Sequence, residues 1–141
     1  MQKFDSQGRF ILAFGAKGEG SGAFTRAIGI PHDGTGNVYL TDDAVPIVQI
    51  FDNEGHFMRS FEIGRSGPVP GTSEGLNIDT LGIYVSDYDR GLVEVYTSES
   101  ELLVEFGESE LWAPVDIGIS HDGTVLVTDQ RTGLVHVYQI K

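Results

Sequence analysis

The chain has 141 residues, of which 40% are hydrophobic, enough for one domain with a core of its own. Its formal net charge of -12 disfavours a nucleic-acid partner, because an acidic surface repels phosphate backbones. It has no cysteine, and its apolar runs stay well below the roughly 18 residues of a membrane span, so the sequence predicts neither disulfides nor a membrane-spanning segment. No signal segment is visible, and the sequence does not distinguish an extracellular from a cytoplasmic protein.

The first elements in chain order are two strand-like stretches, residues 1–5 and 10–14, joined by a polar turn. The glycine-rich stretch "GAKGEGSG" at residues 15–22 follows them. It lacks the GxxxxGK[ST] order of a phosphate-binding loop and leads into no helix. We therefore expect it to be a connecting loop.

A repeat runs through the remainder of the chain. The stretch "VYLTD" at 38–42 returns as "IYVSD" at 83–87 and as "VLVTD" at 125–129, and the final aspartates lie 45 and 42 residues apart. A second alternating strand follows each copy, and these strands read "IVQIFD", "LVEVYT" and "LVHVYQ". Short apolar segments around Ile30, Leu76 and Ile117 precede the copies. A further strand ending in phenylalanine follows the first two copies. Each unit thus has four strands, which we name a, b, c and d in chain order.

Four strands in roughly 40 to 50 residues is the period of a propeller blade. We predict an all-β protein, a β-propeller built of four-stranded antiparallel blades with about three blades per chain. The spacing from Phe4 to Phe10 matches that from Phe51 to Phe57, so residues 1–14 are predicted to be strands c and d of a split blade. Residues 15–63 and 64–107 are the predicted whole blades, and residues 108–141 supply strands a to c of the last one.

Two stretches resemble NHL repeats: "FTRAIGIPHDGTGNVYLTDDAVPIVQIFDNEGHFMRSF" and "LWAPVDIGISHDGTVLVTDQRTGLVHVYQ". Members of this family form β-propellers, commonly six-bladed, so the resemblance implies a half or partial propeller. NHL repeats often carry an arginine at the start of strand c, where this chain has Ile47, Leu92 and Leu134.

A three-blade arc leaves two apolar blade faces open, and soluble monomers rarely expose such faces. The faces could be covered by a second copy, which would close a six-bladed ring about a two-fold axis, or by the remainder of a longer propeller chain. The chain has one c strand more than three blades need. We expect Phe10 and Phe14 to pack as an outer strand against a blade that residues 15–111 do not supply.

The loops from b to c and from d to a share one face of a propeller, and such loops commonly bind partners. We predict that this face binds a protein or peptide. The candidate residues in these loops are Asp42, Asp43, Asp87, Tyr88, Asp89, Arg90, Trp112, Asp129, Gln130 and Arg131.

The repeated aspartates Asp42, Asp87 and Asp129 allow two interpretations. They could form a carboxylate cluster that holds Ca²⁺, which prefers oxygen ligands. The favoured interpretation is that each accepts N–H groups of its own turn, because a structural requirement recurs in every blade. His32 and His121 both begin an "HDG" stretch but hold different places in the repeat, so a zinc site is disfavoured. We predict no cofactor, with calcium or zinc as the alternative.

No nucleophile elbow, HExxH or SxxK motif is present. The leading hypothesis is a non-catalytic interaction or scaffold module. The alternative, implied by similar six-bladed propellers, is a metal-dependent lyase or lactone hydrolase with ligands near the central channel. The acidic loops disfavour RNA binding.

Overall fold

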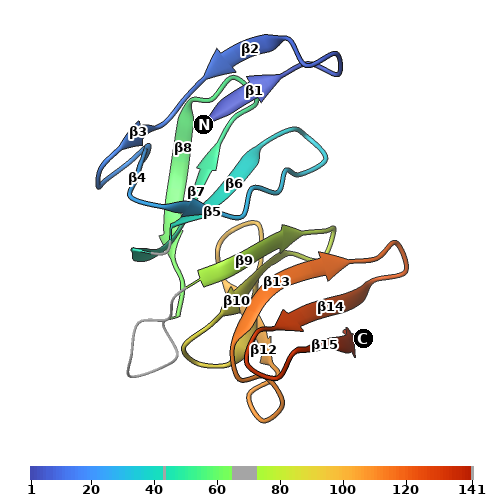
Figure 1. The fold of residues 1–141 in the computed structure, drawn as a ribbon. Coiled ribbons are helices and arrows are strands. Elements are labelled where there is room, and N and C mark those ends of the chain that lie inside the picture. The colour runs from blue at the N-terminus through green and yellow to red at the C-terminus, as the bar shows by residue number, and fades with distance from the viewer. Residues whose placement is uncertain (43, 65–72, 141) are drawn as a thin grey trace.

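The computed structural model describes residues 1–42, 44–64 and 73–140 (Figure 1). These residues form strands and turns without any helix, and thus without a helix able to cross a membrane. The strands are β1 (Gln2–Phe4), β2 (Phe10–Ala13), β3 (Ala16–Lys17), β4 (Ala23–Phe24), β5 (Ala27–Ile28), β6 (Val38–Asp42), β7 (Val45–Phe51), β8 (Phe57–Glu62), β9 (Ser73–Ile78), β10 (Ile83–Asp87), β11 (Leu92–Tyr96), β12 (Leu102–Phe106), β13 (Pro114–Ile119), β14 (Thr124–Asp129) and β15 (Leu134–Gln139).

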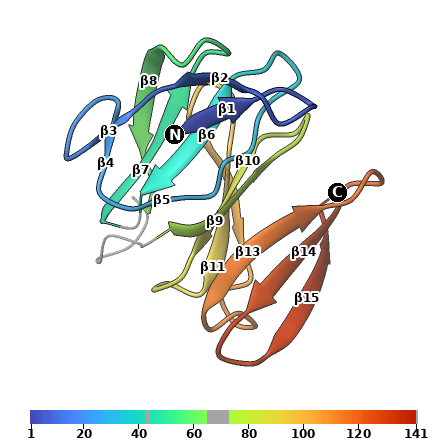
Figure 2. The same cartoon turned by 45° about the horizontal axis from the view of Figure 1, so that its top comes forward.

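Three antiparallel sheets follow one another along the chain. The first has the order β5-β6-β7-β8, the second β9-β10-β11-β12, and the third β13-β14-β15. In each sheet the strands are paired in chain order by tight connections, as predicted for strands a to d. The hairpin β1–β2 packs on the first sheet at the end of the molecule away from the third (Figures 1 and 2).

The cores lie between the sheets because the c strands are apolar on both faces. Val48 and Ile50 of β7 face the second sheet, where they pack with Leu76, Ile83 and Val85. The adjacent Phe51 points the other way and packs with Phe24 and Leu40. The predicted alternation along β7 is therefore confirmed, and residues 48–51 are buried on both faces of this strand.

Two expectations were wrong. Ile30 lies outside the first strand a, which ends at Ile28. Gly29 adopts a φ of 54°, in the left-handed region, and interrupts the ladder, which resumes beyond Ile30: the Tyr39 N–H donates a hydrogen bond to the Pro31 carbonyl, and His32 forms an antiparallel bridge with Val38. The second wrong expectation concerns Phe14 alone: its ring centroid lies 5.3 Å from that of Phe51, so residues 15–111 supply its packing partner, whereas Phe10 contacts Phe4 of its own hairpin.

Strands β11 and β15 carry nearly the same sequence in opposite environments. Val93 and Val95 of β11 are 0% exposed, because they pack against Ile117 and Val125 of the third sheet. The corresponding Val135 and Val137 of β15 are 58% and 62% exposed. The third sheet therefore ends the arc with an open apolar face, and β15 pairs with β14 alone.

Candidate functional site

Asp42 and Asp129 end the b strands of the first and third sheets and each ties two loops together. Asp129 accepts hydrogen bonds from the N–H groups of Trp112 and Ala113, which precede strand a, and from those of Arg131 and Thr132 in its own turn. Burial opposes ionisation of Asp129, but these N–H donors outweigh it and lower the pKa of the carboxyl group.

Asp42 binds the equivalent positions of the first sheet. Its carboxylate accepts hydrogen bonds from the N–H groups of Thr25 and Arg26 before strand a, and from that of Ala44 in the turn after strand b. Both aspartates accept N–H groups of their own b–c turn, as predicted from the sequence, and they also join that turn to the d–a loop, which was not predicted.

Asp87, at the same place in the second sheet, differs from the other two. Its Oδ1 accepts a hydrogen bond from the Arg90 N–H at 2.9 Å, while its Oδ2 lies 3.5 Å from the Arg90 guanidinium and has no hydrogen bond among the described residues. The side chain is buried, and burial raises its pKa from 3.8 to about 6.

Arg90 joins Asp87 to two glutamates that the sequence analysis did not single out. Its guanidinium lies 2.7 Å from an oxygen of Glu94 and 2.7 Å from an oxygen of Glu105. The second oxygen of Glu94 accepts hydrogen bonds from the hydroxyl of Tyr96 and the N–H of Gly64. The buried network satisfies Glu94, whose side chain is 1% exposed.

Glu94 is a charged residue in the middle of the apolar run "LVEVY", and this break in the pattern is the feature of the sequence that indicates a special role for it. Gln49 holds the same position in β7, accepting a hydrogen bond from the Gly22 N–H and donating one to the Ala23 carbonyl. A polar side chain in strand c therefore fixes the loop that leads into strand a. This role depends on a contact across the sheet, which the sequence pattern alone does not reveal.

The outer rim of the b–c face carries the remaining candidates. Trp112 is 61% exposed, and the Arg131 guanidinium lies 5.4 Å from its ring centroid. The Gln130 N–H donates a hydrogen bond to the Ala113 carbonyl, so it fixes the same loop. Tyr88 is half-buried and Asp89 is exposed on the second b–c turn, whereas Asp43 lies outside the described residues.

The opposite face has a polar pocket of about 810 Å³ between the three a–b turns. Asp33, Asp79 and Asp122 line it, but each carboxylate accepts hydrogen bonds within its own turn. Burial opposes ionisation of Asp33, yet hydrogen bonds from Thr35 and Asn37 lower its pKa to about 2. In the described part of the chain, no group of three or more His, Asp or Glu side chains is placed to hold a metal ion.

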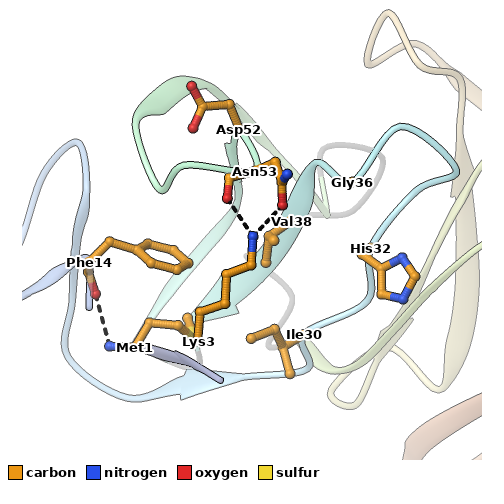
Figure 3. A pocket seen from close by; sticks show the side chains of 9 residues that line it. All are labelled: Met1, Lys3, Phe14, Ile30, His32, Gly36, Val38, Asp52 and Asn53. Atoms are coloured by element: carbon orange, nitrogen blue, oxygen red, sulfur yellow. Dashed lines mark hydrogen bonds between the residues drawn. The ribbon is translucent and has the colours of Figure 1, made fainter. Parts of the chain in front are cut away.

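An apolar pocket of about 410 Å³ lies between the hairpin β1–β2 and the first sheet (Figure 3). Met1 and Phe14 line one side, and Ile30 and Val38 line the other. The side chain of Lys3 crosses between them, and its ammonium group donates hydrogen bonds to the backbone and side-chain oxygens of Asn53 (Figure 3).

No protein-family model matches the sequence, and no curated protein matches it. Solved structures do match the fold. Virginiamycin B lyase from Staphylococcus aureus is 12% identical with a TM-score of 0.70, over 99% of this chain and 48% of that one. The calcium-binding protein regucalcin from Agrobacterium tumefaciens strain C58 is 17% identical with a TM-score of 0.63, over 83% of this chain and 46% of that one.

A third match is BBS1N, solved in complex with ARL6DN, at 14% identity and a TM-score of 0.64 over 84% of this chain and 35% of that one. The chain is therefore a β-propeller portion built of antiparallel blades, and it spans less than half of the length of each of these structures.

Proposed function

We propose that this chain is a non-catalytic scaffold module of NHL propeller type, which assembles with further blades and presents its b–c and d–a loop face to a protein or peptide. The observation that carries the proposal is the open face of the third sheet. Val135 and Val137 are exposed where Val93 and Val95 are fully buried, so the face has the composition of a blade interface without an occupant.

The loop face supports the second half of the proposal. Trp112 is an exposed aromatic side chain beside a guanidinium, a combination that is common at the centre of protein interfaces. The Asp129 carboxylate accepts hydrogen bonds from the N–H groups of Trp112 and Ala113, so this loop is held in place by the chain's own contacts. A protein-bound propeller among the similar structures is consistent with this use of the fold.

The test of assembly is the solution mass of the 141-residue chain, measured by light scattering. We expect a mass of at least twice 15.3 kDa for the wild type and 15.3 kDa for Val137→Glu, because a carboxylate on the open face cannot be buried without a partner charge. Leu103→Glu is the matched control, since Leu103 is half exposed on β12, a strand of the second sheet and not of the third. A soluble, folded wild-type monomer would overturn the proposal.

Metal analysis tests the non-catalytic part. The carboxylates of Asp42 and Asp129 already accept backbone hydrogen bonds, so we expect no stoichiometric Ca²⁺ or Zn²⁺ after dialysis against either ion. Asp87→Ala should leave the metal content unchanged. Stoichiometric metal that disappears in Asp87→Ala would instead support the metal-dependent enzyme.

A further inference from the structure

The two internal blade contacts of this chain define what a third contact of the same kind requires. In the first, Val48 and Ile50 of β7 pack on Leu76 and Ile83 of the second sheet. In the second, Val93 and Val95 of β11 pack on Ile117 and Val125 of the third sheet. Each contact therefore joins two β-branched residues of a c strand to one residue of strand a, Leu76 or Ile117, and to one at the start of strand b.

Both halves of a third contact are present at opposite ends of the arc. The c-strand half is Val135 and Val137 of β15, which are exposed. The receiving half is Ile30 and Val38, which hold the positions of Ile117 and Val125 in the first copy of the repeat and line the apolar pocket of Figure 3. Since β15 and the hairpin lie at the two ends of the arc, one chain cannot join them (Figures 1 and 2).

The strand that now covers the receiving half fits it poorly. β1 puts Lys3 where the other c strands have Ile50, Val95 and Val137. The ammonium group of Lys3 avoids the apolar pocket by extending to Asn53, and the pocket remains open beside Ile30, which is 58% exposed. The six residues of β15 are all paired with β14, and β15 carries Val137 where β1 has Lys3, so it is the better c strand by sequence.

We infer that a second copy of this chain binds here by strand exchange: β15 of each copy displaces β1 of the other and pairs with its β2. The inference rests on the proposed assembly and specifies that the partner is a second copy, whose β15 lies at the position of β1. Val135 and Val137 then take the positions of Met1 and Lys3 beside Ile30 and Val38. The exchange is reciprocal, completes both third sheets with a fourth strand, and gives a ring of six sheets about a two-fold axis.

The register of the exchanged pair follows from the existing ladders. β11 pairs with β12 as Val93 with Phe106 and Val95 with Val104. When the d strands of the repeat are aligned on their closing phenylalanines, Phe14 and Leu12 of β2 correspond to Phe106 and Val104 of β12. Val135 of one copy therefore lies opposite Phe14 of the other, and Val137 opposite Leu12.

Two double-cysteine variants of the full chain test the exchange, and the protein has no cysteine that would interfere. In Leu12→Cys/Val137→Cys the pair lies in different copies, so oxidation should produce a covalent dimer on a non-reducing gel. In Lys3→Cys/Leu12→Cys the pair lies in one hairpin, where Lys3 is directly opposite Leu12, so oxidation should lock β1 in place. The single variant Leu12→Cys controls for random cross-linking.

The inference predicts that the locked hairpin has the monomer mass when oxidised and twice that mass when reduced. A locked chain that still forms dimers would overturn it, as would dimers of Leu12→Cys/Val137→Cys that cross-link no more than Leu12→Cys. In both of those results the proposed assembly would stand, with another occupant or another contact. A wild-type chain that stays monomeric would overturn the inference and the proposed assembly together.

Discussion

Asp87 and Asp129 end equivalent b strands, yet their environments push their pKa values in opposite directions. The Asp129 carboxylate accepts four backbone hydrogen bonds, while the Oδ2 atom of Asp87 accepts none from the described residues and is buried beside Glu94. The same residue at the same place in a repeat therefore stabilises one sheet in its ionised form and the other in its protonated form.

The pH dependence of Asp87→Asn tests this difference. Burial raises the pKa of Asp87 to about 6, above its ordinary value of 3.8, so the folded state holds the proton more tightly than the unfolded state. The free energy of unfolding of the wild type should then fall as the pH rises from about 4 to about 6. Asp87→Asn removes this fall, and we expect it to gain about 2 kcal/mol on the wild type across that range in urea titrations.

Asp129→Asn is the control, and we expect it to change the free energy of unfolding in the opposite direction. Because the pKa of Asp129 is lowered in the fold, the variant should be less stable than the wild type at neutral pH, and the deficit should shrink as the pH falls below about 4. An Asp87→Asn variant whose stability follows the wild type at every pH would contradict the assigned role of Asp87.

The turn role of Asp42 and Asp129 was predictable from the sequence, because an aspartate at the end of a strand and before a turn uses local donors. The roles of Glu94 and Gln49 were not predictable in the same way. Their partners at Gly64 and Gly22 lie 30 and 27 residues away, and only the folded sheet brings them together.

At the level of elements, the b, c and d strands were found from their alternation and from the phase of the repeat. The bounds of the a strands were harder to predict, because these strands are the innermost and their ends depend on contacts with neighbouring sheets. In the first copy the strand shortens to Ala27–Ile28. The adjacent Gly29 leaves too little room for a side chain, since a Cβ there would lie 2.9 Å from the Cβ of Leu76 in the next sheet.

The contact between strands β9 and β13 gives a prediction at this scale. A Cβ on Gly75 of β9 would lie 2.4 Å from the Val115 carbonyl oxygen, which belongs to the backbone of β13. Gly75→Ala should therefore force the second and third sheets apart and lower the free energy of unfolding by about 3 kcal/mol in urea denaturation.

Gly118→Ala is the matched substitution, because Gly118 lies in β13 and a Cβ there would meet nothing closer than 3.9 Å. We expect it to change the free energy of unfolding by less than about 1 kcal/mol. Equal effects of the two substitutions would show that the close approach of β9 and β13 is not what Gly75 permits.

For the whole molecule, the fold was predictable because each repeat carries the same signal, and the sheets confirm it in the second and third copies as well as the first. The arrangement of residues 1–14 was predictable only in part. Their hairpin was expected, but the packing of Phe14 on Phe51 depends on the curvature of the arc, which brings the hairpin onto the first sheet.

The net charge of -12 on each copy gives a prediction for assembly. Two acidic copies repel one another, while burial of the apolar face is insensitive to charge screening, so added salt should strengthen association. We expect the dissociation constant of the dimer to fall by about tenfold between low salt and about 1 M sodium chloride, measured by analytical ultracentrifugation. Weaker association at high salt would indicate that ion pairs hold the copies together instead.

The pairing of β1 with β2 also bears on the rate of assembly. On the proposed exchange, β1 of each chain covers Ile30 and Val38. It has to separate from β2 before β15 of a second copy can take its place. At high protein concentration the opening of the hairpin, rather than the encounter of two chains, then limits the rate of assembly. On the same proposal, β1 is easier to replace than a c strand with valine at this position, because the Lys3 ammonium group extends to Asn53 instead of filling the apolar pocket.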